Sequence, residues 1–130
     1  GGGALAWSHR HATIPADLDL ATTRASAQGH YRVTIAPHAA TIPLHTIHAW
    51  TLHIEDAAGR PVEGATIAVD GGMPQHGHGL PTRPRVTGDL GHGDYLVEGL
   101  KFQMGGWWVV DFDIAGAGRL DDVRFNLILE

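Results

Sequence analysis

Short runs in which apolar and polar residues alternate recur along the whole chain. Residues 48–54, HAWTLHI, place His48, Trp50, Leu52 and Ile54 on one side and smaller or polar residues on the other. Residues 107–115, WWVVDFDIA, alternate in the same way. Because side chains of a β-strand point to opposite faces in turn, this period of two predicts half-buried strands.

Eight segments show the strand pattern, and none shows a convincing helical period. They are residues 17–22, 30–36, 48–54, 62–70, 85–90, 94–104, 107–115 and 122–129. Clusters of glycine and proline separate them, which is typical of turns between short strands. The sequence therefore predicts an all-β fold, an immunoglobulin-like antiparallel β-sandwich of seven or eight strands. We expect a single domain over residues 17–130, preceded by an N-terminal arm, residues 1–16, without clear alternation.

Composition narrows the classes of function. Nine basic residues against fourteen acidic ones give a net charge of −5, and no basic patch is visible, so nucleic acid is not expected as a partner. No apolar run reaches about 18 residues, so no membrane span is expected in this chain. The absence of cysteine excludes disulfides, thiolate metal sites and a cysteine nucleophile. Ten histidines in 130 residues are the unusual feature.

The segment GGMPQHGHGLPT, residues 71–82, combines those histidines with turn-forming residues. It lies in a connection of about fourteen residues between two predicted strands, and connections of that length usually carry function. His76 and His78 are separated by one glycine, and the surrounding glycines allow the backbone to turn both imidazoles toward one point. The segment is therefore either a polar hairpin loop or a loop that wraps a metal ion.

Three further residues extend the metal hypothesis. Met73 precedes His76 by three positions, and Met104, the other methionine, ends a predicted strand where loops gather. Both are poor candidates for core packing in such a setting. His48 shares the inward-facing side of its strand and needs a hydrogen-bond partner or a metal there. Imidazole together with thioether favours copper over calcium or magnesium, which prefer oxygen. We therefore predict Met73, His76, His78, Met104 and His48 as ligands.

Five separated motifs resemble the FixH/YtkA-like family of small extracytoplasmic β-sandwich domains. They are HAW at 48–50, GRPVEGA at 59–65, MPQHGHG at 73–79, GDY at 93–95 and FQMGGW at 102–107. The resemblance covers about residues 30–130. It implies an immunoglobulin-like sandwich outside the cytoplasm, and members are often associated with copper handling or with assembly of copper-containing respiratory oxidases. Met73, His76, His78 and Met104 fall on the family's metal-site positions, and His48 is the histidine of its H-x-W motif.

The function expected from these observations is that of a periplasmic or secreted copper-binding protein. It would act as a chaperone or store that holds one copper ion and exchanges it with a donor or acceptor protein. Histidine dominates the loop where some relatives have more methionine, so Cu(II) is as plausible as Cu(I). The alternative is an interaction module whose histidine-rich loop contacts a partner protein. No nucleophile elbow, phosphate loop or paired-carboxylate motif is present, so no enzymatic activity is expected.

Overall fold

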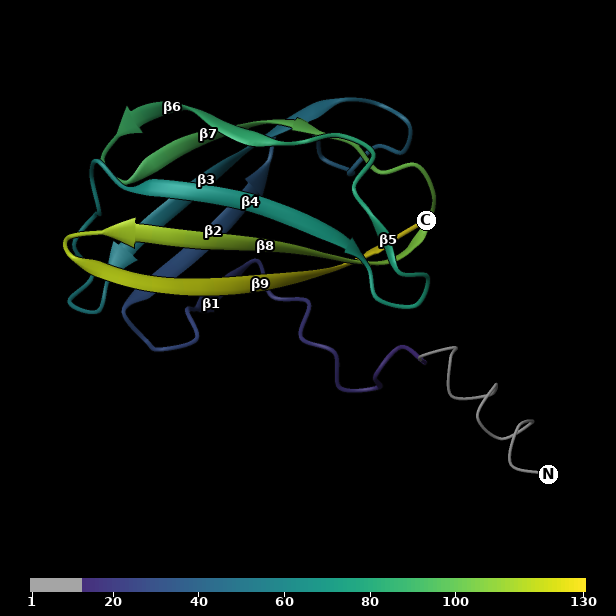
Figure 1. Cartoon of the computed structure of the whole chain (residues 1–130), viewed down its shortest axis with the longest axis horizontal. Coiled ribbons are helices and arrows are strands. Elements are labelled where there is room, and N and C mark those ends of the chain that lie inside the picture. Colours follow the sequence, from purple (N-terminus) through teal and green to yellow (C-terminus); the bar gives the residue numbers. More distant parts are fainter. Residues whose placement is uncertain (1–12) are drawn as a thin grey trace.

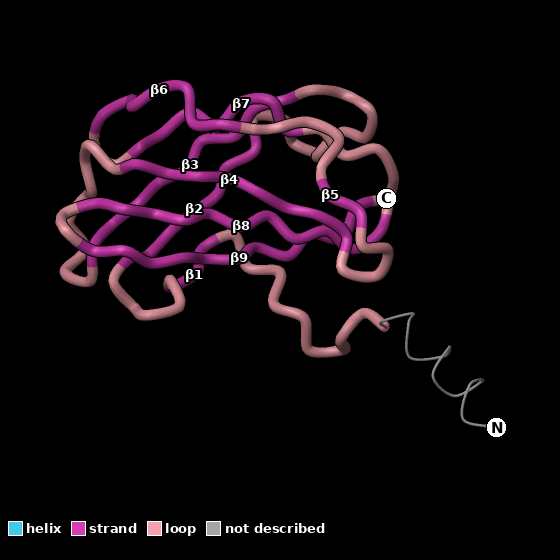
Figure 2. The backbone as a smooth tube through the Cα atoms, in the orientation of Figure 1, coloured by secondary structure: helices cyan, strands magenta, loops and turns pink. Residues whose placement is uncertain are grey.

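The computed structural model describes residues 13–130, which form two antiparallel β-sheets packed face to face (Figure 1). Its strands are β1 (Thr23–Ala25), β2 (Tyr31–Pro37), β3 (His48–Asp56), β4 (Thr66–Met73), β5 (His78–Gly79), β6 (Arg85–Gly91), β7 (Asp94–Leu100), β8 (Gly106–Gly116) and β9 (Arg119–Leu129). One sheet has the order β1-β2-β3-β7-β6 and the other β5-β4-β8-β9. Between residues 13 and 130 every regular element is a strand (Figure 2). The predicted all-β sandwich is confirmed.

The core lies between the sheets and is built from the inward positions of the alternating segments. Trp50, Leu52 and Ile54 of β3 are 0% exposed, as the period of two predicts. The facing sheet contributes the inward positions of β8 and β9: Trp108, Val110, Phe112, Ile114, Val123, Phe125, Leu127 and Leu129. Burying side chains of this size contributes about 1.5–3 kcal/mol each, so the two sheets are held together mainly by this layer.

Several predicted boundaries are wrong, for local physical reasons. Residues 17–22 form no strand, because the Asp19 carboxylate accepts from the Ala21 N–H (2.9 Å) and the Asp19 carbonyl accepts from the Asn126 side chain (3.0 Å). The strand predicted from residue 62 begins at Thr66, after Gly64 in a left-handed conformation (φ 67°). The strand predicted over 94–104 ends at Leu100. Of the predicted arm, residues 1–12 lie outside the described residues.

The long loop predicted after Asp70 is also shorter than expected. β4 continues through Gly71 and Gly72 to Met73, and a tight turn leads directly into the two-residue β5. A Cβ atom on Gly71 would lie 2.5 Å from the Val109 carbonyl oxygen, so only glycine lets the two backbones pair there. The two glycines that suggested a loop therefore mark a close approach between strands.

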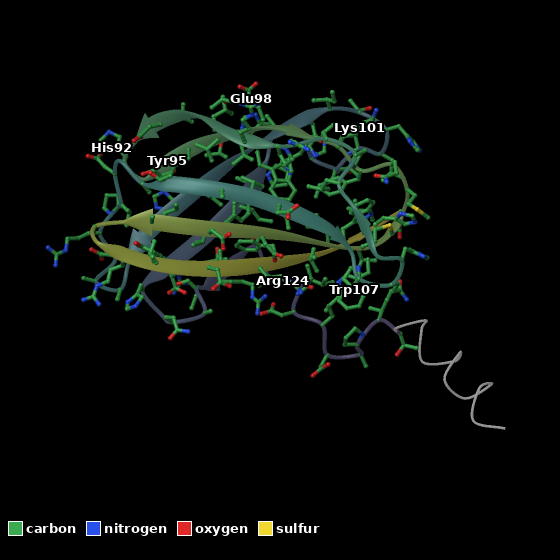
Figure 3. The ribbon with its side chains drawn as sticks, viewed as in Figure 1. His92, Tyr95, Glu98, Lys101, Trp107 and Arg124 are labelled. Carbon is green, nitrogen blue, oxygen red and sulfur yellow. The ribbon has the colours of Figure 1, made fainter. Side chains whose placement is uncertain are left out.

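Three connections meet at one end of the sandwich, which we call the loop end. They are residues 38–47 between β2 and β3, residues 74–84 between β4 and β6, and residues 101–105 between β7 and β8 (Figure 1). The His45 N–H donates to the Phe102 carbonyl (2.8 Å), which joins the first connection to the third. In Figure 3, Lys101 lies toward this end and His92 lies at the opposite one.

Strand β9 is an edge strand of its sheet, and other parts of the chain cover its outer side. The Ala27 N–H donates to the Asp122 carbonyl (2.8 Å), and the Arg24 guanidinium donates to the Arg124 carbonyl (2.6 Å). Farther along, the Asn126 side chain binds the Asp19 carbonyl (3.0 Å). The first residues of the domain therefore occupy much of the hydrogen-bonding edge of this strand.

Candidate metal centre

His48 begins β3 at the loop end, and its imidazole is held in one orientation. Its Nδ1 lies 2.9 Å from the Thr46 carbonyl oxygen. Because a carbonyl only accepts, Nδ1 carries a proton, and in the neutral ring the lone pair is therefore on Nε2. Nε2 is buried and has no hydrogen-bond partner among the described residues. A backbone carbonyl that fixes the tautomer while the other nitrogen stays free is the arrangement in which histidine binds metals.

Aromatic rings surround His48 and connect it to Met104. The Phe102 ring lies 5.6 Å from the His48 ring and 5.1 Å from the Trp108 ring. The Trp108 indole N–H donates to the Met104 carbonyl (2.9 Å), which fixes the backbone that carries the thioether. Two further buried polar atoms have no hydrogen-bond partner in the described residues. They are the indole N–H of Trp50, a residue that is 0% exposed, and Oε1 of Gln103. Unpartnered buried polar groups are rare in folded proteins, so their occurrence here marks this region as unusual.

His76 lies on the turn between β4 and β5, and His78 is the first residue of β5. The Met73 carbonyl accepts from the N–H groups of His76 (3.1 Å) and Gly77 (3.0 Å), and Gly77 has a left-handed conformation (φ 64°). The two exposed rings have centroids 6.0 Å apart. Two imidazoles bound to one ion through bonds of about 2.0–2.1 Å have centroids up to about 6 Å apart. The pair is therefore within reach of a shared ion.

The two methionines occupy different environments. Met73 is only 1% exposed and belongs to the core, so the interpretation of Met73 as a poor core residue is wrong. Met104 is 41% exposed, as expected of a residue in a loop. The Met73 methyl group would lie 3.1 Å from a Cβ on Gly106, two residues after Met104. Met73 thus packs beneath the segment that carries Met104.

All five predicted ligands lie at the loop end, but they do not form one preassembled cluster. Within residues 13–130 no three histidine, aspartate or glutamate side chains are grouped as a metal site. The three candidate histidines are therefore divided between the exposed His76–His78 pair and the buried nitrogen of His48. A third ligand for the pair must come from a thioether or from rearrangement of the turn.

Carboxylates near the pair are engaged elsewhere. Asp111 accepts two hydrogen bonds from Arg124 (2.7 and 3.0 Å), and Asp70 accepts from the Gly71 N–H (2.8 Å). His78 borders the same shallow depression of about 260 Å³ as these two carboxylates. Hard cations need several oxygen ligands, and within residues 13–130 no three aspartate, glutamate or histidine side chains form such a group.

His53 has the strongest imidazole–carboxylate contacts, yet it is unsuited to be a ligand. Its Nδ1 lies 2.7 Å from Asp94 and its Nε2 lies 3.0 Å from Glu55. Burial lowers the pKa of His53, but the hydrogen bonds to Asp94 and Glu55 and the charges of both outweigh burial and raise it. Both nitrogens are occupied, so His53 joins strands β3 and β7 and is unavailable to a metal.

Sequence reasoning missed two contributors to the loop end. Phe102 was only part of a motif, and the packing of its ring against His48 depends on contacts between distant strands. His45 belongs to none of the motifs in the sequence, but it has a left-handed backbone (φ 62°), which is uncommon for residues other than glycine. A hydrogen bond to Phe102 holds this conformation, and no local sequence signal announces it.

Gly72 offers a test of how the histidine pair is positioned. A Cβ on Gly72 would lie 2.5 Å from the His78 carbonyl oxygen, so Gly72→Ala should push β5 away from β4. For the copper site predicted from the sequence, we expect the affinity to fall about tenfold, the effect typical of losing support around a ligand, while far-ultraviolet circular dichroism stays unchanged. Gly79→Ala is the matched control, because its Cβ would meet nothing nearer than 3.9 Å. Equal affinities in the two variants would contradict this role of Gly72.

A family model described as YtkA-like matches residues 25–113, more than half of the chain. The chain belongs to the YtkA-like family. The matched region contains all five predicted ligands, and the resemblance inferred from the motifs is confirmed. Comparisons with curated proteins and with solved structures gave no significant match. In the described part of this YtkA-like chain, no helix has the length and apolar character that crossing a bilayer requires.

Proposed function

We propose that this YtkA-like protein is an extracytoplasmic copper carrier that binds one ion at the loop end through imidazole and thioether ligands. The observation that supports it most is the buried Nε2 of His48, whose lone pair is free while Thr46 fixes the ring. The exposed His76–His78 pair supplies further nitrogen ligands after rearrangement of the turn that carries it, and Met104 supplies sulfur. This donor set selects copper, because zinc, calcium and magnesium rarely use thioethers.

Exposure of part of the donor set suits a carrier. His76, His78 and Met104 are exposed, so ligands of a second protein can replace them one at a time. His48 is half-buried among aromatic rings and holds the ion from the inside. Exchange by successive ligand replacement avoids releasing free copper, which is the task of a chaperone or store.

We expect His76→Ala with His78→Ala to abolish stoichiometric copper binding, as measured by titration of the purified protein with Cu(II) and, under reducing conditions, Cu(I). The double variant should keep its thermal stability, because both side chains are exposed and contribute little to the core. The matched control removes two histidines at the opposite end, His30→Ala with His92→Asn, and should bind one copper ion like the wild type.

His48→Asn completes the experiment. The asparagine amide can still donate to the Thr46 carbonyl, but it has no counterpart of Nε2. Copper affinity should therefore fall while the fold is retained. Full-affinity binding by both His76→Ala/His78→Ala and His48→Asn would reject the proposal and leave the alternative, in which the loop contacts a partner protein without a metal.

A further inference from the structure

Charge is distributed unevenly between the two ends of this acidic protein. The three connections at the loop end, residues 38–47, 74–84 and 101–105, contain no aspartate or glutamate, although the chain has a net charge of −5. They contain Arg83 and Lys101, and Arg85 follows directly at the start of β6. The three connections are therefore basic segments of a protein whose overall charge is negative.

These three basic residues lie on segments that pack together. The Thr82 hydroxyl donates to the Gly99 carbonyl, and a Cβ on Gly99 would lie 3.4 Å from Pro84, which brings residues 82–85 beside the end of β7. Lys101 follows β7 by one residue. In the register of β6 and β7, Arg85 lies opposite Glu98.

The basic residues have no internal ion-pair partner in the described part of the chain. Arg24, Arg60 and Arg124 each pair with an aspartate, whereas Arg83, Arg85 and Lys101 form no ion pair. The Glu98 carboxylate accepts from the Thr87 hydroxyl (2.5 Å). Glu130 also lies at this end, because its backbone lies beside Gly105.

Exposed apolar side chains accompany this charge. Ile47 is 63% exposed and directly precedes His48, and Met104 is 41% exposed on the neighbouring connection. Apolar side chains with a polar rim are one feature of protein interaction sites. The surface formed by Ile47, Met104, Arg83, Arg85 and Lys101, which we call the basic rim, therefore borders the candidate metal centre.

We propose that the basic rim docks an acidic protein that exchanges copper with this one. This inference rests on the proposed function and adds the chemistry of the partner. Carboxylates of the partner would complement Arg83, Arg85 and Lys101, while Ile47 and Met104 supply apolar contact. Opposite charges steer association and orient the partner, so the ligands on both sides meet at the metal. A bound copper cation adds positive charge, so the loaded form docks more tightly than the empty form.

An acidic protein fits the basic rim better than an anionic membrane does. Electrostatic binding to lipids generally uses clusters of about four to eight basic residues. The basic rim has three, on a protein of net charge −5. Its apolar component also consists of single side chains on two loops and forms no amphipathic helix.

The test uses a fluorescent peptide with two methionines and six aspartates, together with the same peptide carrying asparagine at the six positions. Binding to the metal-free protein is measured by fluorescence anisotropy at low and high salt. We expect Arg83→Gln with Lys101→Gln to weaken binding of the aspartate peptide about fivefold or more at low salt, with the difference reduced at high salt. The matched control is Arg60→Gln with Arg119→Gln, at the opposite end of the sandwich. This double variant should bind the aspartate peptide as the wild type does.

Copper transfer supplies the second measurement. The rate of transfer from loaded protein to the aspartate peptide should fall about tenfold in Arg83→Gln/Lys101→Gln, while the copper affinity of that variant equals the wild-type value. Fluorescence anisotropy needs no metal, so the docking surface can be tested even if the protein binds no copper. Absence of copper binding would therefore refute only the proposed function. Equal binding of the two peptides, or equal effects of the two double variants, would overturn the docking surface. A third outcome would also overturn the docking of an acidic protein. In that outcome the wild type binds phosphatidylglycerol vesicles but not the peptide, and Arg83→Gln/Lys101→Gln no longer binds the vesicles, so the basic rim would bind a membrane.

Discussion

Asp121→Ala should lower the free energy of unfolding by about 3 kcal/mol, because one buried carboxylate organises the start of the domain. Asp121 is 7% exposed and accepts from the Ser26 hydroxyl (2.6 Å) and from the N–H groups of Gln28 (3.0 Å), His30 (3.1 Å) and Asp122 (2.8 Å). Alanine would leave these donors without an acceptor. Urea denaturation of both proteins measures the difference.

Asp122→Ala is the matched control and should change stability by no more than about 0.5 kcal/mol, since that side chain is exposed. If Asp121→Ala does not fold, Asp121→Asn keeps one acceptor and should lose a smaller part of the stability. Identical unfolding midpoints for wild type and Asp121→Asn would show that the carboxylate is dispensable.

The same carboxylate predicts a dependence of stability on acid. Burial would raise the pKa of Asp121, but its hydrogen bonds, first that from Ser26, lower it from 3.8 to about 2. Because folding lowers the pKa of Asp121, the ionised carboxylate stabilises the folded protein fully when the pH is above the pKa of the unfolded state. This contribution of about 2 kcal/mol is lost as the pH falls from about 4 to about 2. Asp121→Asn should therefore show a flatter stability profile between these pH values than the wild type.

Phe102→Ala should lower the free energy of unfolding by about 3–5 kcal/mol, the usual range for a fully buried phenylalanine. Phe102 is 0% exposed, and its ring lies between those of His48, Trp50 and Trp108. The cavity would release the His48 imidazole from its fixed position. We therefore expect weaker copper binding as well, measured by competition with a copper chelator.

Leucine variants separate packing from metal binding. Phe102→Leu and Phe112→Leu replace two phenylalanines that are both 0% exposed, but Phe112 packs against Phe125, away from the predicted ligands. Both should lose about 1–2 kcal/mol of stability, and only Phe102→Leu should lose copper affinity. An equal loss of affinity in both variants would mean that Phe102 acts only through global stability.

The alternation of residues was sufficient to predict the sandwich and most of its inward face. Segments such as 48–54 and 107–115 obey a period of two because each strand is buried on one side only, and this constraint is local. Boundaries depended on contacts between strands. Gly71 and Gly72 looked like loop residues until the backbone of Val109 and the carbonyl of His78 were seen beside them.

In the candidate site, too, local sequence patterns predicted some features, while others depended on contacts between distant segments. The predicted ligands of the H-x-H motif and the two methionines lie in or beside the connections that this topology brings to the loop end. The sequence could not give the tautomer of His48, which depends on the Thr46 carbonyl, or the burial of Met73, which depends on its packing beneath the segment that carries Met104. The sequence also could not show that His48 is separate from the His76–His78 pair. Whether side chains on different strands converge on one point depends on their directions in the folded structure.

The covering of β9 has a consequence for behaviour at high concentration. An eleven-residue strand with a bare edge is a template for polymerisation with other copies of the chain. Here Arg24 and Ala27 already occupy backbone carbonyls along that edge, so a foreign strand would first have to displace them. The chain is thereby protected from fibril growth along this edge by its own first strand and the residues beside it.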